Sequence, residues 1–228
     1  MSDFLDRFRP DPEFPESRRM WETEKPLLID SVVEFAPYDP DYRKAKVGKR
    51  KPYPLEPSCP SGKVASNQVS VVLETLSDDF AELQQNGWDH LVLHASEVEQ
   101  SLMKKLVAVH RKCLKQFLEE ELPDADHLQA SWKRIQGELK SPVEDATNQF
   151  FKLVGITLVT EGLDECCFVG FEFQTGWDQD HGLEILMHKD RVLAAGGMSE
   201  LVGADGSIVE RIRAVQEYDL DADDFRVI

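Results

Sequence analysis

The fold is decided by residues 171–188, which read FEFQTGWDQDHGLEILMH. Apolar, strand-like runs at the two ends of this stretch flank a polar centre with a tryptophan, two aspartates and a histidine. A hairpin turn needs only small turn residues, so a bulky Trp177 beside an Asp-x-Asp-His cluster requires an explanation. The stretch predicts a strand–turn–strand unit and marks its turn as the first place to look for a functional site.

More strand-like runs surround this unit. They occupy residues 151–159, 167–173, 183–188 and 191–195, with short connections between them. Short connections favour antiparallel neighbours, so the second half of the chain predicts an antiparallel β-meander. Earlier strands are predicted within 27–35 and 68–76, with a short helix starting near Asp78.

The residues before the meander have helical periodicity. Ser96 and Glu99 have the spacing of a capping box, and apolar residues then recur every three or four positions until acidic residues and Pro123 end the helix. A second helix is predicted from about residue 124 or 126 to 139, and a short third one from 142 to 149. Helices followed by strands predict an α+β fold, in which a helical pair and a short helix pack on the meander.

The N-terminal region differs in composition from the rest. Residues 1–25 are rich in proline and charge, and they predict an irregular, extended arm; 26–216 form a single α+β domain, and 217–228 an acidic tail. The arm also carries apolar residues that we expect to dock either on the body or on a second protomer, which would give a homodimer. These residues are Phe4, Leu5, Phe8, Phe14, Met20 and Trp21.

The charge of the chain limits its partners. Its 43 acidic and 26 basic residues give a formal net charge of −17. Such a field repels nucleic acid and anionic membranes, so it favours either a solubilising surface or a basic protein partner. The N-terminus lacks the pattern of a signal peptide, and the four scattered cysteines are typical of reduced thiols, so we expect a cytoplasmic protein.

The turn cluster has two interpretations. In the structural one, Asp178 accepts backbone N–H groups, His181 donates to a neighbour, Gly182 supplies a positive φ or a bulge, and Trp177 closes the core. In the functional one, carboxylates and imidazoles hold zinc or manganese or exchange protons; the candidates are Asp178, Asp180, His181, Glu184 and His188. The spacing fits no metal-ligand template, which favours the structural role and predicts no cofactor. His90, His94 and His110 are interpreted as ordinary surface or core histidines.

The cluster also resembles a family signature. It is similar to the W-D-x-E-H-G-x-G pattern of an uncharacterised bacterial domain family, which it matches from Trp177 to Leu183. It differs at Asp180, where the family usually has Glu, and at Glu184, where Gly is common. The helices and strands from about 97 to 197 resemble that family's layout.

The family has no established activity, and its members resemble accessory or immunity-type proteins of bacterial toxin systems. The resemblance therefore implies a protein-binding role without enzymatic activity, directed at a basic partner. The alternative is a divalent-metal-dependent hydrolase centred on Asp178, Asp180 and His181.

Overall fold

The structure of the 228-residue chain is a computed structural model. The described residues are 2–27, 33–35, 60–64, 66–119, 151–175, 182–196, 207–208 and 210. The helices are α1 (Ser2–Leu5), the 3-10 helix η1 (Asp78–Phe80), α3 (Ala81–Leu93) and α4 (Ala95–Glu119). The strands are β1 (Arg9–Pro10), β2 (Arg19–Glu24), β3 (Val33–Phe35), β4 (Pro60–Val64), β5 (Gln68–Leu73), β6 (Phe151–Leu163), β7 (Cys166–Thr175), β8 (Leu183–His188) and β9 (Arg191–Gly196).

The main structural feature is a seven-stranded sheet with the order β1-β2-β5-β6-β7-β8-β9, beside a two-stranded sheet of β3 and β4. Strands β6 to β9 form the predicted antiparallel meander. Strand β5 pairs with β6 in parallel, and α3 and α4 lie in the chain segment that joins these two strands. The α+β fold class is therefore confirmed.

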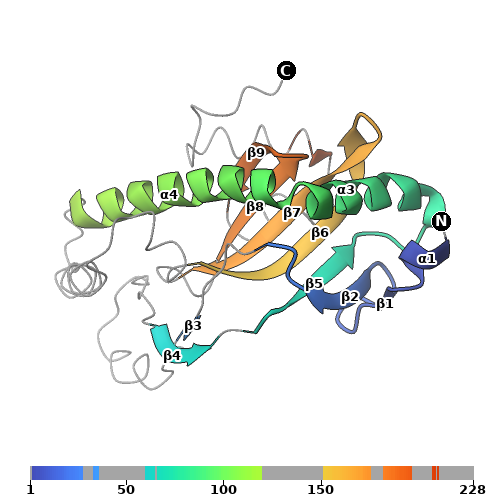
Figure 1. The fold of residues 1–228 in the computed structure, drawn as a ribbon, viewed down its shortest axis with the longest axis horizontal. Coiled ribbons are helices and arrows are strands. Elements are labelled where there is room, and N and C mark those ends of the chain that lie inside the picture. The colour runs from blue at the N-terminus through green and yellow to red at the C-terminus, as the bar shows by residue number, and fades with distance from the viewer. Residues whose placement is uncertain are drawn as a thin grey trace.

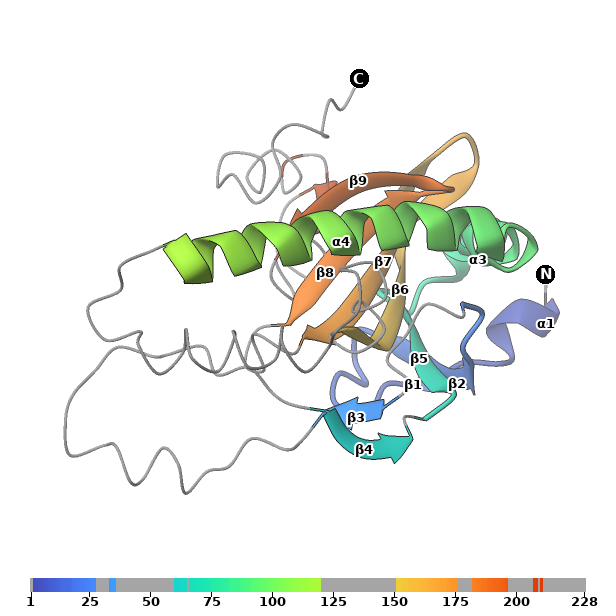
Figure 2. The same cartoon turned by 60° about the vertical axis from the view of Figure 1, so that its left-hand side comes forward.

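Helices α3 and α4 follow one another across one face of the sheet (Figures 1 and 2). The core lies between them and the sheet, because alternate residues of each strand point to this face. Among its fully buried members are Leu102 and Leu106 of α4 and Ile156, Phe171 and Ile185 of the meander. Each such side chain contributes about 1.5–3 kcal/mol by leaving water.

A smaller apolar cluster lies on the opposite face of the meander. Its members come from β6 to β9 and from the C-terminal region: Val159, Phe168, Leu186, Leu193, Ala194 and Ile208. Strand β8 is consequently buried along its whole length, on both faces. This double burial explains why residues 183–188 are nearly continuous in apolar character.

The start of α4 differs from the expected capping box. Helix α3 is longer than the short helix predicted near Asp78 and continues to Leu93, where His94 alone separates it from α4. The N–H of Val98 donates to the carbonyl of His94 at 3.0 Å, and that of His94 to His90 at 2.9 Å. The backbone carbonyls of preceding residues accept from these N–H groups. Ser96 therefore lies inside the helix and does not cap it.

The N-terminal segment is more regular than the sequence indicated. Strand β2 joins the main sheet, where it pairs antiparallel with β5. Phe4 and Phe8 are buried, and Phe8 meets Trp21 edge-on with ring centroids 5.8 Å apart. Trp21 in turn contacts Trp88 of α3 at 5.2 Å. A chain of aromatic rings thus connects the segment to the body of its own chain.

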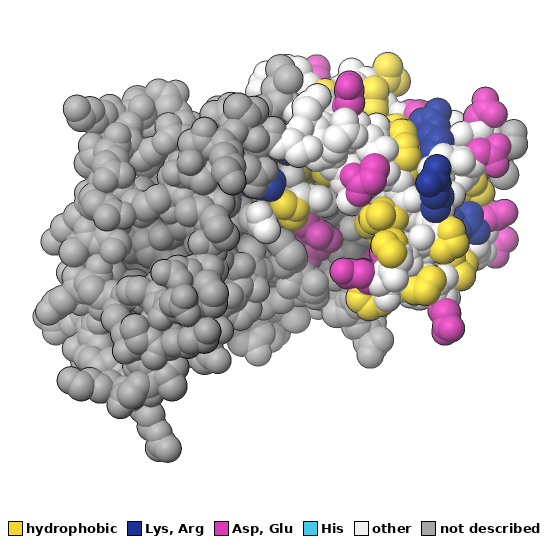
Figure 3. Space-filling model, turned by 90° about the horizontal axis from the view of Figure 1, so that it is seen from below, with side chains coloured by type: hydrophobic (Ala, Val, Ile, Leu, Met, Phe, Trp, Pro, Cys, Tyr) yellow, Lys and Arg dark blue, Asp and Glu magenta, His cyan; other side chains and the backbone are white. Residues whose placement is uncertain are grey.

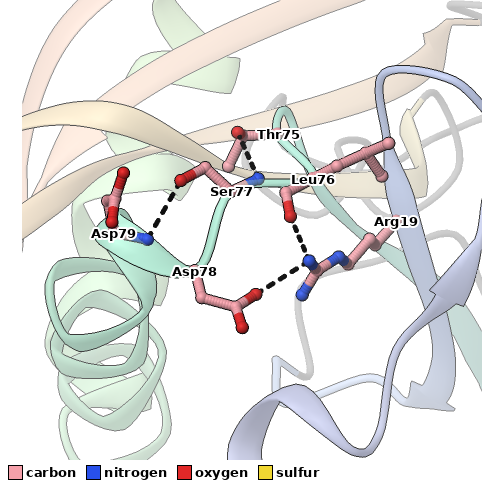
Figure 4. A network of polar contacts seen from close by, with 6 residues as sticks. All are labelled: Arg19, Thr75, Leu76, Ser77, Asp78 and Asp79. Carbon is pink, nitrogen blue, oxygen red and sulfur yellow. Dashed lines mark hydrogen bonds and ion pairs between the residues drawn. The ribbon is translucent and has the colours of Figure 1, made fainter.

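Arg19 of β2 secures this segment to the residues before α3 (Figure 4). Its guanidinium donates to the backbone carbonyl of Leu76 and lies 2.8 Å from the carboxylate of Asp78. The hydroxyl of Ser77 accepts from the N–H of Asp79 at 3.1 Å and caps η1. The loop between β5 and α3 is therefore held from both sides.

Candidate functional site

The sequence candidates divide into two groups. Trp177, Asp178, Asp180 and His181 lie outside the described residues, as do the helices predicted for 124–149 and the acidic tail 217–228. Gly182, Glu184 and His188 are described and lie at or within β8. Gly182, directly before β8, has φ of 60°, a left-handed conformation that a side chain would disfavour.

His188 is held by the backbone. Its Nε2 lies 2.9 Å from the carbonyl oxygen of Leu163, and its ring meets Phe168 edge-on at 5.7 Å. A carbonyl oxygen can only accept, so Nε2 carries the proton of this hydrogen bond. This contact leaves Nδ1 as the one ring nitrogen of His188 that could bind a metal.

Two carboxyl groups face each other across β7 and β8. Glu172 and Glu184 are directly opposed in the register, and Glu184 is fully buried. Burial raises the pKa of Glu172, and a hydrogen bond from Thr157 at 3.4 Å and the charge of Arg18 oppose this effect. A Cβ atom at Gly155 would lie 2.8 Å from the Glu172 carboxylate, so this glycine makes room for it.

The same register continues across the sheet. Successive pairs place a row of acidic and small residues on the face opposite α3 and α4: Glu22, Ser70, Gly155, Glu172, Glu184 and Gly196. The hydroxyl of Ser70 donates to the carboxylate of Glu22 at one end of this row. In the described part of the chain, no three His, Cys, Asp or Glu side chains are arranged to hold a metal ion.

A second group of polar residues gathers where two hairpin turns meet the α3–α4 junction, at one end of the sheet (Figures 1 and 2). Among the described residues, the non-glycine residues with positive φ are Asp164, Glu165 and Lys189, and all three lie in these turns. Asp164 and Glu165 both have positive φ, as a two-residue type I′ turn requires. The hairpin itself therefore accounts for the conformation of Asp164 and Glu165.

Polar contacts connect these turns to each other and to α3. Lys189 lies 3.5 Å from the carboxylate of Asp164, and the side-chain amide of Asn86 donates to the carbonyl of Glu165 at 2.8 Å. The exposed ion pair contributes little stability, about 0–1 kcal/mol.

Two histidines stack beside these turns. The rings of His90 and His94 have centroids 4.4 Å apart and planes 26° apart. Burial lowers the pKa of His90 and is the largest effect. The adjacent His94 lowers it further, as do Lys189 and His188, whereas Asp190 raises it. His90 is therefore neutral at neutral pH, with one ring nitrogen able to accept a proton or bind a metal.

Exposed apolar side chains occur at the same end of the molecule. Leu93 is 79% exposed, and Val92 and Leu163 are about half exposed. The exposed acids Asp89, Asp164, Glu165 and Asp190 belong to the same helix and turns, and the β8–β9 hairpin also carries the bases Lys189 and Arg191. We call Val92, Leu93 and Leu163, together with these four acids, the hairpin-end surface. On the face seen in Figure 3, by contrast, Lys and Arg, acidic and apolar side chains are interspersed in the described part.

The described cysteines do not have the properties of nucleophiles. Cys166 and Cys167 are free thiols, both buried, and burial raises the pKa of each. A protonated thiol is a poor nucleophile, so both act as small apolar side chains. Within the described residues, no helix combines the length and apolar character needed to cross a membrane.

Sequence reasoning overlooked the hairpin-end surface, because its members come from three separate segments. One signal was present in the sequence: His90 and His94 have the i, i+4 spacing that puts two side chains on one side of a helix. That spacing gained significance only when 81–93 proved to be a helix.

The comparison with protein families gives a match over most of the chain. A family model described as a domain of unknown function (DUF6985) matches residues 60–202, a region that includes the Trp177–Glu184 signature and extends beyond the 97–197 expected from the sequence. No curated protein and no solved structure shows a significant match. Strands β5 to β9 and helices α3 and α4 all fall inside the matched region. The chain therefore belongs to the DUF6985 family, whose activity is not established.

Proposed function

We propose that this protein is an acidic protein-binding module, of the accessory or immunity type, that neutralises a basic partner. The hairpin-end surface carries the proposal, since it combines Leu93, 79% exposed, with a rim of carboxylates. Interfaces commonly place apolar side chains at the centre and charged ones at the rim. The net charge of −17 would speed the encounter with a positively charged protein.

Coexpression with the product of the adjacent gene tests the proposal. We expect the two proteins to copurify, and the complex to weaken by at least about tenfold when Leu93→Lys places a like charge against a basic partner. Phe14→Lys is the matched control, because Phe14 is 49% exposed but lies on the N-terminal segment. An inert monomer that neither binds the neighbouring product nor relieves its toxicity would contradict the proposal.

A homodimer through the N-terminal segment remains a second proposal. In the structure, Phe4 and Phe8 pack on the body of their own chain. The same contacts would form between protomers if the segments were exchanged, because the contacting surfaces are identical. Light scattering during size-exclusion chromatography would detect the dimer, and a monomer at all concentrations would exclude it.

The metal-dependent hydrolase centred on Asp178, Asp180 and His181 is the competing proposal, and it rests on the sequence alone. Elemental analysis of the purified protein distinguishes it from the binding module. We expect Asp178→Asn to leave partner binding unchanged if the module is correct. Bound zinc or manganese that this substitution removes, together with hydrolytic activity, would favour the hydrolase.

A further inference from the structure

Two neighbouring histidines at the α3–α4 junction are candidates for a ligand pair. His90 lies in the last turn of α3, and His94 is the single residue between the two helices. The two ring centroids are 4.4 Å apart, so the imidazoles are close enough to bind one ion together. Each nitrogen binds an ion in the plane of its own ring, and the planes are now stacked, 26° apart, so the exposed ring of His94 must turn before both nitrogens face one ion.

The ring nitrogens are also suited to a ligand. Nε2 of His90 is buried and has no hydrogen-bond partner among the described residues. A buried polar atom of this kind is normally satisfied, so a missing partner points to an absent ligand or water. His94 is exposed, so its ring can turn without disturbing the core.

The charged groups around this position act in both directions. Asp190 raises the pKa of His90 and so favours positive charge there, whereas Lys189 and His188 lower it. The acids Asp164 and Glu165 occupy the other turn at this end, although Lys189 partly offsets them through its contact with Asp164. No third side chain is placed as a ligand in the described part, so water would complete the coordination.

We propose that His90 and His94 form a two-histidine site for a divalent transition-metal ion of the Zn²⁺, Ni²⁺ and Cu²⁺ class. Imidazole nitrogen suits these ions better than it suits Mg²⁺ or Ca²⁺, which prefer oxygen. The order of affinity for such a site places Cu²⁺ above Ni²⁺ and Zn²⁺. The site is separate from the turn cluster at Asp178, Asp180 and His181, and it does not depend on the protein-binding proposal.

Calorimetric titration of the full-length, untagged protein with Zn²⁺, Ni²⁺ and Cu²⁺ at pH 7.5 tests the site. We expect binding of each ion, tightest for Cu²⁺, and a loss of at least about tenfold in affinity in His90→Asn and in His94→Asn. Lowering the pH to 5 should abolish Zn²⁺ and Ni²⁺ binding, because protons compete for the ring nitrogens. Mg²⁺ should produce no response.

His181→Asn is the matched control, since it removes an imidazole from the other candidate centre and leaves His90 and His94 in place. Its Zn²⁺ affinity should equal that of the unchanged protein. Circular dichroism of each variant without metal establishes that it is folded; His94 is exposed, so His94→Asn is the safer of the two site variants.

NMR of the unchanged protein gives a second test that needs no variant. Substoichiometric Cu²⁺ should broaden the imidazole signals of His90 and His94 before those of the buried His110. The proposal is overturned if none of the three ions binds, if affinity is unchanged in both site variants, or if binding is lost in His181→Asn alone.

Discussion

At the scale of single residues, the contact between α3 and the sheet depends on Gly87. A Cβ atom at this position would collide with the sulfur of Cys167 and lie 3.5 Å from the backbone nitrogen and oxygen of the same residue. Cys167 is fully buried in the main core. The absence of a side chain at residue 87 therefore sets how closely the helix approaches β7.

Replacing Gly87 by alanine should destabilise the protein, although the same change in an exposed helix is stabilising. We expect Gly87→Ala to lower the free energy of unfolding by about 1–3 kcal/mol, because the new methyl group overpacks the core. Urea denaturation measures the change. Asp89→Ala, on the exposed side of the same helix, is the control and should not destabilise the fold. Adding Cys167→Ala should relieve the clash; a stabilising effect of Gly87→Ala alone would contradict this account.

The buried His110 should make stability depend on pH. Burial lowers its pKa from 6.5 to about 4, and Arg111 adds to this effect. Between these values the unfolded chain binds more protons than the folded one, so stability is complete above pH 6.5 and falls as the pH drops towards 4. The loss from this residue is about 3 kcal/mol. Urea midpoints from pH 7 to pH 4 should fall less steeply in His110→Leu, and parallel curves would contradict the prediction.

At the scale of elements, the sequence predicts those that carry their own local signals. Strands β6 to β9 are apolar runs, tight turns join β6 to β7 and β8 to β9, and α4 ends at Glu119 near the predicted acids. Helix α3 was underestimated because Gln84, Gly87 and His90 interrupt its apolar pattern. Strand β2 was missed because it is stabilised by pairing with β5, about 50 residues away in sequence, and distant pairing leaves no local pattern.

The N-terminal segment should contribute to stability through its aromatic contacts. We expect Phe8→Ala to cost about 3 kcal/mol in urea denaturation, because it removes a buried ring from the edge of Trp21. Phe14→Ala is the matched control: Phe14 is 49% exposed and contacts Arg18 at 4.7 Å, a contact worth about 1 kcal/mol or less. Equal effects of the two substitutions would show that the segment does not pack on α3.

At the scale of the whole molecule, the sheet is assembled from parts that are distant in sequence. The parallel pairing of β5 with β6 joins residues 70–73 to 155–158, across both long helices. Turn residues and periodicity carry no information about such a pairing, which is why a strand was predicted at 68–76 but strand pairing only within the meander. The hairpin-end surface was missed for the same reason, and the candidates Trp177 to His181 lie outside the described residues. The sequence therefore predicts the fold class better than the location of the site.

The matched family region should not be self-sufficient in this chain. Residues 60–202 include β5, but β1 and β2 precede them, so β5 would become the edge of the main sheet in that fragment. An unpaired apolar edge strand promotes association between chains, and Trp88 would lose its contact with Trp21. We expect the fragment 60–202 to have a lower urea midpoint than the fragment 1–202 and to self-associate in light-scattering measurements. A synthetic peptide of residues 1–27, added in trans, should reverse both changes. If the two fragments instead have the same urea midpoint and the same oligomeric state in light scattering, β2 is dispensable.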